Sequence, residues 1–100
     1  MSGVQQPFGT TYEYIAPSTT AQVMGNNGAA GDMLVRVIAT VTTTATSTLT
    51  IIDGSTSIPL IPANASQGVY SLTVEAQSLN GAWKITTGAG VSAVVVGNFS

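Results

Sequence analysis

The sequence contains no cysteine and no histidine. The absence of cysteine excludes a disulfide framework and thiolate chemistry, and the absence of both residue types removes the usual ligands of a zinc site. A serine nucleophile would need Lys84 or a carboxylate as its base, and nothing in the sequence places Lys84 beside a particular serine. We therefore expect a protein that is not an enzyme and that has no cofactor.

Charged residues are also scarce, at 6% of the chain against about 25% in typical domains. The only cations are Arg36 and Lys84. Two cations cannot neutralise the several phosphates that nucleic-acid binding requires. The longest apolar stretch, residues 91–97, is far shorter than the roughly 20 residues of a membrane-spanning helix. We therefore expect neither nucleic acid nor a membrane as partner.

The low charge has a second consequence. A neutral surface rich in threonine, serine, asparagine and glutamine has little electrostatic repulsion to keep copies apart. We infer that much of this surface is covered in the native state, either by copies of the same chain or by a larger assembly.

The four acids give no sign of a metal site or of a catalytic carboxylate pair. Asp53 begins an Asp53-Gly54 turn, and Asp32 opens a strand. No Asp-x-Asp-x-Asp spacing typical of a calcium loop is present, and a glycosidase-type pair is not supported by the spacing of the acids. We expect no functional metal.

Short β-type runs separated by turn residues follow one another along the chain, and no window shows a helical period. This pattern predicts an all-β protein, an antiparallel β-sandwich of seven to eight strands. Residues 1–11 are expected to form a flexible arm and residues 12–100 a single domain. Pro59 predicts an edge strand, and the Val94–Val96 run is expected to be central in a sheet or covered. The expected strands are residues 12–16, 19–24, 32–43, 48–52, 57–61, 69–77, 82–87 and 91–96.

The aromatic residues leave two alternatives open. Trp83 could be a sugar-stacking platform, with Tyr12, Tyr14 or Tyr70 beside it. However, Ile85 lies on the same face of the expected strand and is apolar, which favours a core position for Trp83.

The second half of the chain contains a succession of turn and strand segments: Ile51-Ile52-Asp53-Gly54, Ile58-Pro59-Leu60-Ile61-Pro62-Ala63, Gly68-Val69-Tyr70, Leu79-Asn80-Gly81, Trp83-Lys84-Ile85-Thr86-Thr87-Gly88 and Val91 to Val96. In these segments, over roughly residues 48–97, the chain resembles small tailed-phage virion proteins of the capsid decoration, cement or head-fibre type. This resemblance implies a jelly-roll sandwich that assembles as a symmetric homo-oligomer, often a homotrimer, on the surface of a bacteriophage capsid.

The resemblance implies a structural protein that decorates or cements the capsid by non-covalent contacts with the major capsid protein and with copies of itself. Our candidates for the contact are Phe8, Tyr12, Tyr14 and Ile15. The alternative is a carbohydrate- or receptor-binding module of a phage fibre or tail, which predicts an exposed Trp83 or an exposed tyrosine pair.

Overall fold

The computed structural model describes residues 11–100, which form eight β-strands and one short 3₁₀ helix. This confirms the expected all-β class, since no α-helix occurs within residues 11–100. The elements are β1 (Thr11–Ile15), β2 (Gln22–Val23), β3 (Met33–Val41), η1 (Thr44–Thr46), β4 (Leu49–Asp53), β5 (Thr56–Ile61), β6 (Gly68–Gln77), β7 (Trp83–Thr87) and β8 (Val91–Asn98).

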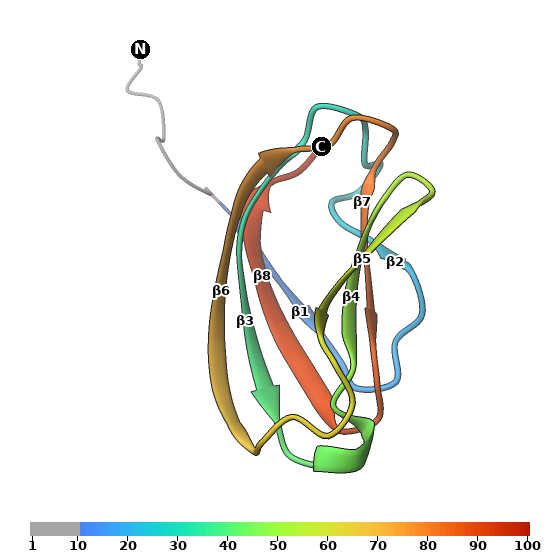
Figure 1. Ribbon diagram of the computed structural model, residues 1–100. Helices are drawn as coiled ribbons and strands as arrows, with labels where there is room; N and C mark the ends of the chain where they lie inside the picture. Colours follow the sequence, from blue (N-terminus) through green and yellow to red (C-terminus); the bar gives the residue numbers. More distant parts are fainter. Residues whose placement is uncertain (1–10) are drawn as a thin grey trace.

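The strands form two four-stranded antiparallel sheets that face each other (Figure 1). One sheet has the order β1-β8-β3-β6, and the other has the order β2-β7-β4-β5. The first strand pairs with the last, the second with the seventh, the third with the sixth and the fourth with the fifth. Strands far apart in the sequence therefore lie side by side, and each sheet draws on both halves of the chain.

The core lies between the two sheets and follows from the two-residue alternation of strand side chains. In β8, Val91, Ala93 and Val95 are buried and alternate with half-buried neighbours. The facing sheet contributes Ile51 of β4 and Ile85 of β7. Each fully buried aliphatic side chain of this kind contributes about 1.5–3 kcal/mol relative to an exposed position. This apolar layer holds the two sheets together.

Two predictions about strand position are confirmed. Pro59 lies in β5, the last strand of its sheet, where its missing N–H costs no ladder hydrogen bond on the free side. The Val94–Val96 run lies in β8, between β1 and β3, so both of its backbone edges are paired.

Some boundaries differ from those expected. The strand expected over residues 19–24 is reduced to Gln22–Val23. Thr11, which we assigned to the arm, is the first residue of β1: it pairs with Gly97, and its hydroxyl donates to the Gly97 carbonyl at 3.1 Å. A single hydroxyl residue gives too little pattern to mark where a strand begins.

Two turns at one end of the sandwich are tied together by the buried carboxylate of Asp53. Its oxygens accept hydrogen bonds from the backbone N–H groups of Leu79 and Asn80, at 3.0–3.1 Å. Gly54, which follows in the β4–β5 turn, has φ +62°, a conformation that favours glycine. Asp53 therefore has the structural role expected of it, and it also fastens the β6–β7 turn.

No helix within residues 11–100 has the length and hydropathy needed to cross a membrane.

Candidate interaction surface

The outer face is our name for the surface of the β1-β8-β3-β6 sheet that points away from the second sheet. The strand register places its side chains in rows. Tyr12 pairs with Val96, which pairs with Arg36. In the next row Tyr14 pairs with Val94, and Val94 pairs with Ile38 on β3. The apolar rows of the outer face consist of Tyr12, Tyr14, Ile38, Val94 and Val96, and Arg36 ends the first row. Strand β6 adds Ser71 and Thr73, which pair with Ile38 and Arg36, and Glu75.

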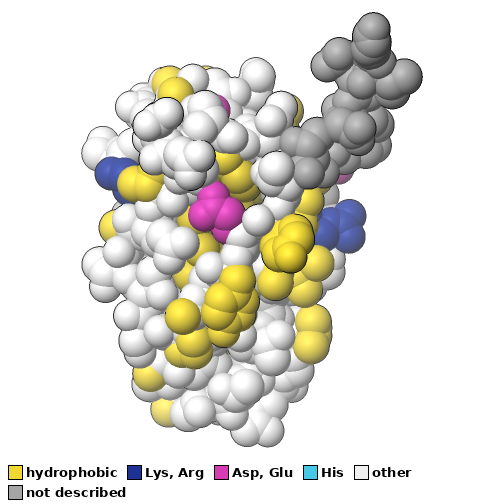
Figure 2. Space-filling view, turned by 180° about the vertical axis from the view of Figure 1, so that it is seen from behind, with side chains coloured by type: hydrophobic (Ala, Val, Ile, Leu, Met, Phe, Trp, Pro, Cys, Tyr) yellow, Lys and Arg dark blue, Asp and Glu magenta, His cyan; other side chains and the backbone are white. Residues whose placement is uncertain are grey.

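The two tyrosines are the most exposed part of these apolar rows. Tyr12 is 71% exposed and Tyr14 is 59% exposed, whereas Ile38, Val94 and Val96 are half-buried. Figure 2 views the molecule from the side of β1 and β2 and shows hydrophobic side chains over its middle and right-hand part, around an acidic side chain and next to a basic one. An apolar group of this kind on a small domain indicates a binding surface more often than scattered single residues do.

A hollow of about 310 Å³ opens beside the apolar rows and is lined by Val35, Arg36, Glu75 and Val96. It lies where the ladder is irregular: the register of β3 against both β6 and β8 shifts between Leu34 and Arg36. Val35 is 7% exposed but does not belong to the core cluster between the sheets. The irregularity therefore places an apolar floor under a pair of oppositely charged side chains.

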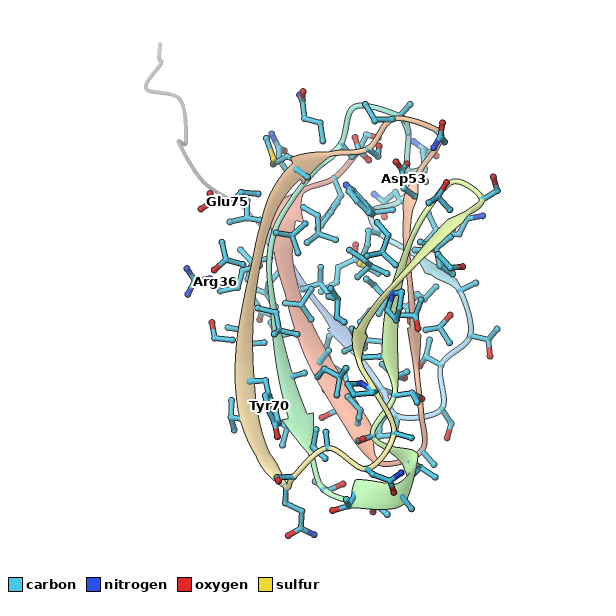
Figure 3. All side chains as sticks on the ribbon, viewed as in Figure 1. Arg36, Asp53, Tyr70 and Glu75 are labelled. Carbon is cyan, nitrogen blue, oxygen red and sulfur yellow. The ribbon has the colours of Figure 1, made fainter. Side chains whose placement is uncertain are left out.

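Arg36 and Glu75 project from the outer face, away from the second sheet (Figure 3). The Arg36 guanidinium donates a hydrogen bond to the hydroxyl of Ser71 on the neighbouring strand, at 3.3 Å. Glu75 has φ +51°, an uncommon conformation for a residue other than glycine. The hollow thus has an apolar floor and rim groups of both signs, and it can accept an apolar side chain together with a polar or charged group.

The other carboxylates are engaged inside the domain. Glu13 accepts a hydrogen bond from the backbone N–H of Gly25. Asp32 accepts from the backbone N–H groups of Ala29 and Ser100, each at 3.1 Å. Since Asp53 holds the β6–β7 turn, Glu75 is the one acid among residues 11–100 for which the structure assigns no hydrogen-bond donor. It is also the acid that lies on the outer face.

The four predicted contact residues are divided by the structure. Phe8 lies outside the described residues. Tyr12 and Tyr14 are exposed on the outer face, as a contact role requires. The assignment of Ile15 is wrong: it is fully buried and belongs to the core cluster. The reason is the alternation along β1, which turns Ile15 inwards when Tyr14 points outwards.

Two of the residues considered for sugar stacking are not available for it. Trp83 is only 3% exposed and packs in the core with Ile85, as the apolar alternation had favoured. Tyr70 is half-buried, its ring packs against the core, and its hydroxyl donates to the Ser66 carbonyl at 2.6 Å. Figure 3 shows Tyr70 on the opposite side of the sheet from Arg36 and Glu75. Neither ring presents an open face.

No group of three or more metal-ligating His, Cys, Asp or Glu side chains occurs within the part of the chain that the structure describes. Lys84, the one candidate base for a serine nucleophile, has Val23 and Ile52 as its cross-strand neighbours.

Sequence reasoning did not name Ile38, Val94 and Val96 as contact residues. Their continuous apolar runs left open whether both sides of each strand are buried in the core or one side is covered by a partner. One signal was present: both β3 and β8 are apolar at successive positions, and in a two-layer sandwich only one side of each strand can face the core. The hollow had no such signal, since it depends on the irregular pairing of three strands.

No protein-family model, curated protein or solved structure matches this chain.

Proposed function

We propose that this protein is a bacteriophage structural protein that decorates or cements the capsid. In this proposal the outer face binds the major capsid protein, and further contacts join copies of the chain. The proposal assigns no catalytic role to any residue. The observation that carries it is the exposed tyrosine pair, Tyr12 and Tyr14, in front of a half-buried valine and isoleucine layer.

The chemistry of the outer face suits attachment to a large protein assembly. Tyrosine is enriched in protein interfaces because its ring contributes buried apolar area while its hydroxyl finds a hydrogen-bond partner. Charged residues are depleted from the centre of interfaces, and on this face Arg36 stands at the edge of the apolar rows, by the hollow. Repetition of a modest contact over many capsid positions gives high total avidity.

The arrangement of strands supports the finer part of the proposal, a jelly roll. A jelly roll has eight strands in two sheets built from Greek keys. If a long antiparallel hairpin is rolled up, its strands pair first with last, second with seventh and so on, and the pairings β1-β8, β2-β7, β3-β6 and β4-β5 follow that rule. The resemblance of residues 48–97 to phage virion proteins implies the same fold and an oligomer that is often a trimer.

The alternative function, a carbohydrate- or receptor-binding module of a fibre or tail, has less support. One of its expectations, an exposed Trp83, is not met, because Trp83 packs in the core and Tyr70 packs against it. The other expectation, an exposed tyrosine pair, is met by Tyr12 and Tyr14. However, these two rings stand over apolar side chains, with few polar groups beside them to bind sugar hydroxyls.

Antibody labelling of phage particles tests the proposal. An antibody raised against the purified chain is applied, with gold detection, to particles of the phage that encodes it. Label spread over the head supports decoration. Label confined to the tail or fibres would favour the alternative, and particles without label would contradict both.

The contact surface is tested by recoating. Heads that lack the protein are mixed with the wild-type chain or with a Tyr12→Ser, Tyr14→Ser double variant, and bound protein is measured after sedimentation. We expect the double variant to lose attachment, and a matched Thr50→Ser, Thr86→Ser variant on the opposite sheet to keep it. Equal attachment of both variants would exclude the outer face as the contact.

A further inference from the structure

The free edge of β6 is the longest strand edge in the described part of the chain that no other strand covers. β6 has ten residues and pairs on one side only, with β3. An uncovered edge presents unpaired backbone N–H and C=O groups, and natural proteins protect such edges with prolines, lysines, bulges or very short strands. The other edges of the two sheets show such protection.

Three of the four edge strands are protected. β5 carries Pro59, and β2 has only two residues. β1 has five residues, and the side chain of Glu13 ties it to the backbone of Gly25. In β6 the only protective features are the ladder irregularity and Glu75, and both lie towards its C-terminal end. The stretch Gly68–Thr73 has neither proline nor charge.

The side chains of this stretch also show that the edge is open. Val69 is 70% exposed. Leu72 and Tyr70 point to the core side but are only half-buried, because β6 is the last strand of its sheet within residues 11–100. A further strand beside β6 would cover them and would pair its backbone groups.

We propose that β6 pairs with β6 of a second copy of this chain, as antiparallel strands around a two-fold axis, and so joins two four-stranded sheets into one. This inference rests on the self-association that is part of the proposed function, and it names the surface. A strand paired antiparallel with its own copy forms a closed, self-limiting contact. The segment Gly68–Thr73 is uncharged, so a copy of it is not repelled, and its valine, tyrosine, leucine and threonine favour β structure.

The pairing gives a two-fold dimer, which differs from the trimer that the resemblance implies. The two assemblies are separable by mass. Light scattering of the wild-type chain should show a concentration-dependent rise from 10.1 kDa towards twice that value. A stable trimer at all concentrations would overturn the β6 pairing while leaving capsid decoration intact.

Cysteine cross-linking tests the register directly, because the chain has no cysteine of its own. Single cysteines are introduced at each position from Val69 to Thr73. Directly opposed residues in an antiparallel pair have Cβ atoms about 4.5–5.5 Å apart and are closest in non-hydrogen-bonded pairs. A disulfide needs about 3.5–4.5 Å, so a small shift of the two strands closes it. Oxidation should therefore give a covalent dimer at the one position that lies on the two-fold axis, with little at its neighbours. Ser57→Cys on β5, the exposed edge strand of the other sheet, is the matched control and should stay monomeric.

A charge variant completes the test. Ser71→Lys places a lysine on the β6 edge and should lower the dimer association constant by about tenfold, since like charges face each other across the axis. Ser57→Lys should leave it unchanged. Absence of a cross-link at all five positions overturns the proposal. A wild-type chain that stays monomeric at all concentrations overturns it as well.

Discussion

The indole N–H of Trp83 donates a hydrogen bond to the backbone carbonyl oxygen of Asp32 at 3.0 Å. The same carbonyl accepts the backbone N–H of Ser78 at 2.9 Å. Trp83 opens β7 in one sheet, and Asp32 directly precedes β3 in the other. This side chain therefore links the two sheets by a polar contact as well as by its buried ring, which explains why it is not available to a ligand.

Replacing Trp83 by phenylalanine should destabilise the domain by about 2–3 kcal/mol. The change removes one hydrogen bond and leaves a cavity where the larger ring packed. Urea denaturation followed by circular dichroism measures the effect. Tyr14→Phe on the outer face is the control and should change the free energy of unfolding by less than about 0.5 kcal/mol. Equal stability of the two variants would mean that Trp83 does not bridge the sheets.

The fluorescence of Trp83, the only tryptophan, provides a second prediction. Because the ring is 3% exposed, we expect blue-shifted emission and weak quenching by acrylamide. Denaturant should shift the emission to the red and restore quenching. Strong quenching in the native protein would place the ring at the surface and would reopen the sugar-stacking alternative.

Asp53 offers a test of the buried carboxylate. Asp53→Ala removes the acceptor for the backbone N–H groups of Leu79 and Asn80 and leaves them without a partner. Hydrogen bonds to a charged group contribute about 1.5–3 kcal/mol each, so we expect a loss of about 2–4 kcal/mol in thermal or urea unfolding. Glu75→Ala on the outer face is the matched acid and should leave stability unchanged. The proposed role of Asp53 fails if both variants unfold alike.

Much of the fold was predictable because it rests on local signals. Pro59 marked an edge, Asp53-Gly54 marked a hairpin, and the Trp83–Ile85 alternation identified the inward side of β7. The β1-β8 and β2-β7 pairings had no such signal, because they join residues more than sixty positions apart. The misplacement of Ile15 has the same origin: its direction depends on the register with β8, and β1 alone is too short to fix which side is buried.

The candidate site was less predictable than the fold. Tyr12 and Tyr14 were identified as contact residues from their position near the arm. The layer beneath them comes from β3 and β8, whose continuous apolar runs hide which side faces out. The hollow beside Val35 exists only because β3 pairs irregularly with both of its neighbours. A single sequence carries no pattern for such an irregularity.

The contrast between neighbours in β1 separates folding from binding. Ile15→Ala should cost about 2–5 kcal/mol, because it opens a cavity in the core, whereas Tyr14→Ala should leave stability within about 0.5 kcal/mol. In the recoating experiment on protein-free heads, Tyr14→Ala should nevertheless weaken attachment, and folded Ile15→Ala should keep it.

The same assay tests the arm. A chain that starts at Thr11 retains the pairing of β1 with β8, so we expect it to fold with unchanged stability and to lose attachment. Undiminished attachment of this truncated chain would remove Phe8 and the arm from the contact and leave the outer face alone to account for binding.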